Sequence, residues 1–118
     1  MQKEMAIQKF WSSFGVKAYD ESTVPEDAEI PRITYNIAVD SFDRPVSLTA
    51  SIWDRSKSWQ RVTSIKDLVA EAVGYGGTTV KYEGGMVWVK PRTPFAQRMS
   101  DPDDSIRRIV LNLEAEFI

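Results

Sequence analysis

The sequence of 118 residues contains neither cysteine nor histidine. Without cysteine the chain has no disulfide and no thiol nucleophile, and without histidine it has no imidazole for acid–base chemistry. Zinc sites built from these two residue types and the usual haem ligands are excluded as well. Because most catalytic and metal-binding side chains are missing, we expect a protein that is not an enzyme and has no cofactor and no metal site.

Long apolar runs and a strong net charge are also lacking. No apolar run approaches the roughly 20 residues that span a bilayer, and the N-terminus lacks the apolar region of a signal peptide. The 15 basic and 17 acidic residues leave a net charge of -2, which does not draw the chain onto nucleic acid or an anionic membrane. We expect no membrane association, no specific nucleic-acid partner, and a location in the cytoplasm or in a particle assembled there.

The chain does contain enough apolar material for one core. Hydrophobic residues make up 42% of the sequence, and a length of 118 residues is that of a single domain. We therefore expect one domain over residues 1–118.

The first half of the chain combines one helical pattern with two strand patterns. Apolar residues at 7, 10, 11 and 14 predict a helix over residues 3–14, which Gly15 ends. Residues 20–31 hold two prolines among acidic residues and predict an extended connection. Residues 32–40 and 46–54 alternate apolar and polar side chains, and the short turn at 41–45 predicts that they form an antiparallel hairpin.

The second half repeats this arrangement with one more strand. Ser64 and Asp67 resemble a capping pair, which predicts a helix from Ser64 to the stop at Gly74. A hairpin of residues 78–82 and 86–90 follows, and residues 107–118 predict the last strand. The order α-β-β-α-β-β-β predicts an α+β fold with two helices packed on one face of a mostly antiparallel sheet.

Residues 91–105 fit neither pattern. They contain three prolines and show no periodicity, which predicts a long loop of the kind that is usually functional. The segment nevertheless carries apolar side chains that a free loop does not need. We interpret it as an arm that contacts a neighbouring subunit through Phe95 and Met99, with Arg92 and Arg98 forming polar pairs.

Other candidate sites have simpler explanations. The glycine clusters at 74–77 and 84–85 match no phosphate-binding motif and indicate turns. Asp101, Asp103 and Asp104 lack the glycine and glutamate of a calcium-binding loop, so we interpret them as a solvated acidic loop.

A cluster of aromatic and basic residues lies between residues 53 and 61. Trp53 and Trp59 alternate with three basic residues, a composition found in single-strand nucleic-acid sites. The acidic protein around them favours a protein interface instead, because tryptophan and arginine are enriched in interface hot spots. We therefore include Trp53 and Trp59 in an expected protein interface.

Several sequence pieces, taken in order, resemble a known family. They are the helix ending at Gly15, Val24-Pro25, residues 31–35, Leu48, Trp53, residues 84–89, residues 94–97 and residues 107–117. Together they are similar to the tail terminator proteins of long-tailed bacteriophages and prophages, also called tail completion or minor capsid proteins. The similarity extends over nearly the whole chain.

The resemblance implies a structural virion protein at the tail-neck junction. Such a protein forms a hexameric ring on the tail tube, ends tube polymerisation and joins the tube to the head-tail connector protein. Its expected partners are therefore itself, the tail tube protein and the head-tail connector, and the isolated protein is expected to be a monomer or a hexamer. Two alternatives remain open: another phage neck protein, such as a connector or stopper, or a non-viral α+β interaction module.

Overall fold

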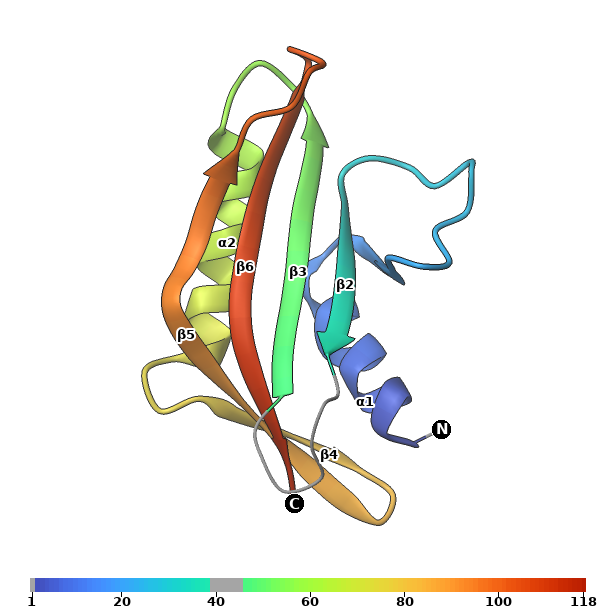
Figure 1. Ribbon diagram of the computed structural model, residues 1–118, viewed down its shortest axis with the longest axis vertical. Helices are drawn as coiled ribbons and strands as arrows, with labels where there is room; N and C mark the ends of the chain where they lie inside the picture. Colours follow the sequence, from blue (N-terminus) through green and yellow to red (C-terminus); the bar gives the residue numbers. More distant parts are fainter. Residues whose placement is uncertain (1, 39–45) are drawn as a thin grey trace.

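The computed structural model describes residues 2–38 and 46–118. The predicted turn at 41–45 and the end of the strand predicted over 32–40 lie outside the described residues. Within these described residues, helices and strands make up nine elements, most of which are labelled in Figure 1. They are α1 (Gln2–Trp11), η1 (Ser12–Phe14), β1 (Lys17–Asp20), β2 (Arg32–Ala38), β3 (Val46–Arg55), α2 (Gln60–Val73), β4 (Thr78–Tyr82), β5 (Gly85–Met99) and β6 (Ile106–Phe117).

The six strands form one sheet in the order β1-β2-β3-β6-β5-β4. Strands β1 and β2 are parallel, and the other four neighbouring pairs are antiparallel. The predicted α+β class with a mostly antiparallel sheet is confirmed. The predicted order of elements is wrong, because β1 adds a strand between the first helix and the first predicted strand.

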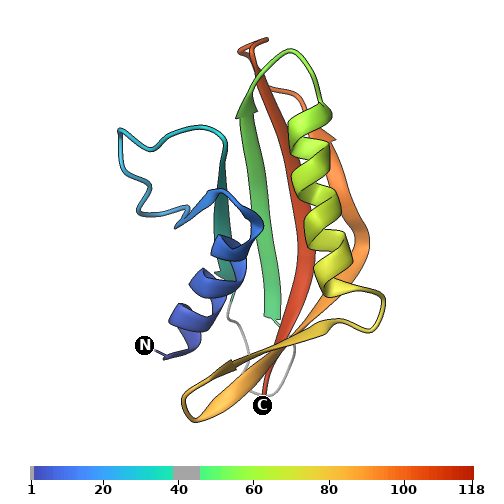
Figure 2. The ribbon, with the colours of Figure 1, turned by 180° about the vertical axis from the view of Figure 1, so that it is seen from behind.

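The helices and the sheet enclose the core. Helix α2 contacts β3, β5 and β6, whereas α1 contacts β1 and β4, and Figure 2 shows both helices in front of the sheet. Strand alternation sends every second side chain to this side. The largest fully buried side chains are Trp11, Ile7, Ile33, Leu48, Ile52, Leu111 and Leu113. Among the described residues, no helix is both long enough and apolar enough to cross a membrane.

Helix α2 begins one turn earlier than predicted. It starts at Gln60, whose backbone N–H donates to the Ser58 hydroxyl at 3.1 Å. Ser64 lies inside the helix and donates from Oγ to the carbonyl oxygen of Gln60 at 2.9 Å, so its predicted role as a cap is wrong. The predicted stop at Gly74 is confirmed, with φ of 67°.

The predicted long loop over residues 91–105 is wrong for most of its length. Strand β5 continues to Met99, and only residues 100–105 form a turn. Prolines conceal this strand because they interrupt the alternation and give no backbone N–H. The sheet accommodates them because β4 pairs with β5 only up to Val89, so Pro91 and Pro94 lie on an edge, next to a register shift between Pro91 and Ala96.

Gly77, between α2 and β4, occupies a position that excludes a side chain. Its φ is +81°, and an added Cβ would lie 2.5 Å from the carbonyl oxygen of Val89. We expect Gly77→Ala to lower the free energy of unfolding by about 2 kcal/mol, because it combines left-handed strain with a backbone clash. Urea denaturation measures the loss. Gly76→Ala is the matched control, since nothing lies within 4 Å of its added Cβ, and an equal loss in both variants would contradict the explanation.

Candidate assembly surface

The outer half of β5 is an unpaired edge of the sheet. Strand β4 pairs with Gly85 to Val89 only, and within the described residues no strand pairs with the outer side of β5 beyond that point. Figure 1 shows this part of β5 along the margin of the sheet, next to β6. Unpaired backbone N–H and C=O groups on an edge are ready to pair with another chain. Residues 91–99, which we call the β5 edge, are therefore the first candidate for an assembly surface.

Two arginines of the β5 edge point to opposite faces of the sheet. Arg92 donates to the hydroxyl of Ser47 at 2.6 Å, on the face turned away from the helices. The guanidinium of Arg98 lies 4.5 Å from the ring centroid of Trp59, on the helix side. Neither arginine has a carboxylate within ion-pair distance among the described residues. A chain that docks on this edge would meet, on each face, an arginine that has no carboxylate partner among the described residues.

The two apolar residues predicted to make contact differ in their surroundings. Phe95 is half-buried and packs against the core, within the register shift of β5. Met99 is 40% exposed. The structure therefore places Met99 on the accessible surface of the β5 edge, whereas Phe95 also supports the local shape of the strand.

The two tryptophans lie in different places. Trp53, on β3, donates from Nε1 to the Thr34 hydroxyl at 2.9 Å, and the Arg108 guanidinium lies 4.5 Å from its ring centroid. Trp59 precedes α2 and contacts Arg98 of the β5 edge. The structure thus brings Trp59 and Arg98 together and leaves Trp53 two strands away, on β3.

The acidic loop near residue 103 joins two loops at one end of the molecule. Arg55 lies 3.6 Å from Asp103, and Lys57 lies 3.9 Å from Asp104. The hydroxyl and backbone N–H of Ser105 hold the pKa of Asp103 below its usual value, and Arg55 adds to this effect. In the described part of the chain, no group of three acidic side chains is arranged to hold a metal ion.

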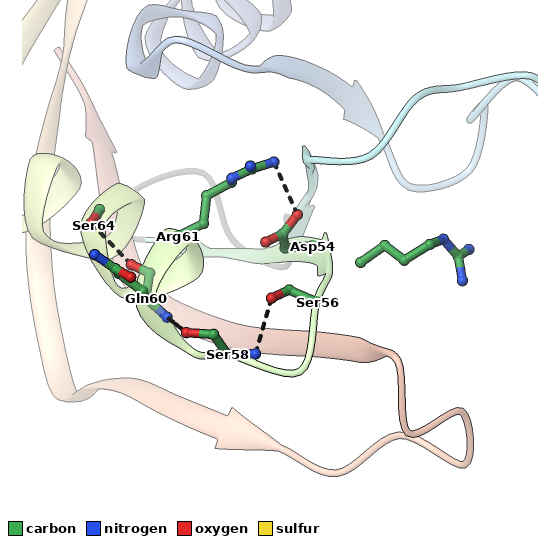
Figure 3. Close-up of a pocket in the computed structure, with 7 residues that line it drawn as sticks. Asp54, Ser56, Ser58, Gln60, Arg61 and Ser64 are labelled. Carbon is green, nitrogen blue, oxygen red and sulfur yellow. Dashed lines mark hydrogen bonds and ion pairs between the residues drawn. The ribbon is translucent and has the colours of Figure 1, made fainter.

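A hollow of about 430 Å³ lies beside the start of α2 (Figure 3). Its most buried lining residue is Asp54, whose side chain is 3% exposed and lies 3.4 Å from Arg61. Asp54 was not singled out from the sequence as a buried residue, although the alternation of β3 indicates that it is buried. Positions 46, 48, 50 and 52 are buried, so position 54 follows the same face with a carboxylate.

Comparisons with known proteins give a likeness in fold. No family model and no curated protein matches the chain. A solved structure titled "Virion of native gene transfer agent (GTA) particle" contains a chain with a similar fold, with a TM-score of 0.68 and 15% sequence identity. The match covers 98% of this chain and 94% of that chain. At this identity the likeness establishes a shared fold over nearly the entire domain.

Proposed function

We propose that the protein is a structural component of a virion, without catalytic activity. In the specific form of this proposal, six copies form a ring that caps the tail tube of a phage-type particle, ends its polymerisation and joins it to the head-tail connector protein. The ring lies at the tail-neck junction and is assembled in the host cytoplasm. Its partners are the tail tube protein, the connector and further copies of the same chain.

The observation that carries the virion role is the fold match to a chain of a gene transfer agent virion. The match extends over 98% of the chain, so it concerns the whole domain and not a common substructure. The ordered sequence resemblance to tail terminator proteins supports the same role independently. A structural protein also needs surfaces for association, and the unpaired β5 edge provides one.

The ring form is supported by the shape of the sheet. Its two margins differ, β1 and β2 on one side and β5 with the short β4 on the other. Contacts between unlike surfaces are head-to-tail, and they close into a ring when the rotation between subunits allows it. Six copies of the 13.4 kDa chain have a mass of about 80 kDa.

Loss of the protein from its particle tests this function. We expect tubes much longer than normal and without attached heads, because nothing would stop polymerisation or present a surface to the connector. Electron microscopy measures tube length and head attachment, and supplying the intact protein in trans is the control. Tails of normal length in its absence would contradict the terminator role, and binding to the connector without the tube would favour another neck protein.

A further inference from the structure

An acidic segment projects from the margin of the sheet opposite the β5 edge. Residues 20–29 begin at the last residue of β1 and continue into the loop before β2, which extends beyond the sheet in Figure 1. Five carboxylates in this segment are exposed: Asp20, Glu21, Glu26, Asp27 and Glu29. None of them forms an ion pair with a described basic residue. We call residues 20–29 the acidic arm.

The acidic arm has a defined shape. The backbone N–H of Ser22 donates to the Asp20 carboxylate at 2.9 Å, and the N–H of Ala28 donates to the carbonyl oxygen of Pro25 at 3.1 Å. Arg32 donates to the carbonyl oxygen of Ala28 at 3.1 Å, so the cation at the base of the arm binds backbone and, in the described structure, pairs with none of the five carboxylates. Little ordering is therefore required when the arm binds a partner.

The acidic arm and the β5 edge are complementary in charge but cannot meet within one chain. The first projects from the β1–β2 margin, and the second carries Arg92 and Arg98 at the other margin, with β3 and β6 between them. Opposite charges on two surfaces favour their contact, whereas like charges oppose the contact of two arms or of two β5 edges. The arrangement thus favours a head-to-tail contact between copies and disfavours a two-fold dimer through either surface.

We propose that the acidic arm of one subunit docks on the β5 edge of a second copy of the chain, with its carboxylates pairing with Arg92 and Arg98. This inference rests on the proposed ring and names the two surfaces that close it. The contact pairs charges that, among the described residues, have no ion-pair partner on either margin of the sheet, and it fixes the direction in which subunits follow one another.

Charge reversal tests the contact. We expect Glu26→Arg with Asp27→Arg, and separately Arg92→Glu with Arg98→Glu, to weaken self-association at least ~10-fold, because each variant opposes like charges at the interface. Neither Glu26 nor Asp27 makes a side-chain hydrogen bond to a described residue, so thermal unfolding of the arm variant should stay close to that of the unmodified protein. The arginine variant also loses the Ser47 hydrogen bond and the Trp59 contact, so the arm variant is the cleaner test. Lys9→Glu on α1 and Glu71→Arg on α2 are the controls, since both are exposed and lie outside the two surfaces.

Mixing the two reversed variants gives a more specific result. The basic arm of the arm variant fits the acidic edge of the edge variant, and the unchanged acidic arm of the edge variant fits the unchanged basic edge of the arm variant. Neither variant fits another copy of itself, so assembly is restored only when the two variants alternate. Native mass spectrometry should detect hexamers with three copies of each variant. Rings that form from either variant alone, with normal affinity, would overturn the inference and leave the proposed function standing.

Cross-linking covers the case in which the isolated protein is a monomer. The chain has no cysteine, so Thr23→Cys with Gln97→Cys introduces one thiol on the arm and one on the β5 edge. A bis-maleimide should produce covalent oligomers up to the hexamer, in concentrated solution or on tube ends. If the protein caps tubes and no arm-to-edge cross-link forms, the inference is wrong. A protein that neither associates nor caps tubes contradicts the proposed function as well.

Discussion

Replacing Trp11 by alanine is expected to lower the free energy of unfolding by about 3–5 kcal/mol, the usual effect of removing a large core side chain. Trp11 is 0% exposed, and its ring meets Phe10 edge-on at a centroid distance of 4.9 Å. Truncation would leave a cavity between α1 and the sheet that the surrounding strands cannot fill. A domain of this kind is stabilised by about 5–15 kcal/mol in total, so urea denaturation should show a large shift.

Trp11→Phe is the informative comparison. It keeps an aromatic ring in the core and removes the indole N–H, which is buried without a hydrogen-bond partner in the described residues. The loss of apolar volume is then partly offset by the loss of an unsatisfied donor. We expect less than half the effect of the alanine variant, and equal losses would show that the ring does not fill the core.

Truncation of Arg107 is expected to cost about 2–3 kcal/mol, since hydrogen bonds from a charged donor contribute about 1.5–3 kcal/mol each and these overlap in one side chain. Its guanidinium donates to the carbonyl oxygens of Lys57 at 3.0 Å and Asp104 at 2.8 Å. It therefore joins the loop before α2 to the turn before β6. Arg107→Ala would release both loops, and thermal unfolding measures the effect.

Two variants separate the hydrogen bonds of Arg107 from its charge and its stacking. Arg107→Lys keeps the positive charge but not the forked donors, so we expect it to recover only part of the loss. The Arg107 guanidinium also lies 5.5 Å from the ring centroid of Trp59. Arg98→Ala removes a guanidinium that contacts the same ring without any carbonyl contact in the described structure. A loss below about 0.5 kcal/mol for Arg107→Ala would contradict this role.

The strands that the sequence predicted correctly are those with one buried face. The alternation around Leu48 and Leu111 is visible because each of these side chains is fully buried and its neighbours in sequence are only partly buried. The sequence does not indicate strand β1, because its four residues are too few to show a two-residue period. The order of the strands was not predictable, since nothing in the sequence indicates that β3 and β6 are neighbours.

The residues of the candidate site were predictable from the sequence, but their secondary structure and their partners were not. The sequence predicts contacts by Arg92 and Arg98 because an apparent loop keeps apolar side chains beside them, yet both arginines lie on an edge strand. Whether a described carboxylate lies near either arginine depends on the distances between elements, which a sequence does not contain. The acidic arm was visible as a run of charges, and its position opposite the β5 edge emerged only from the sheet order.

The position of β6 divides the sheet into two sequential halves. Strands β1–β2–β3 and β4–β5–β6 are each continuous in sequence, and α2 connects them. The halves meet along one seam, where residues 46–55 of β3 pair with residues 106–115 of β6. Each half can form by local pairing, whereas closure of the seam needs contacts distant in sequence, so we expect docking of the halves to be the slow step of folding. Until the halves dock, β3 and β6 each have an edge without a partner strand. Two chains that exchange halves would form the same β3–β6 pairing between them. We therefore expect the connection through α2 to act as the hinge of a domain swap.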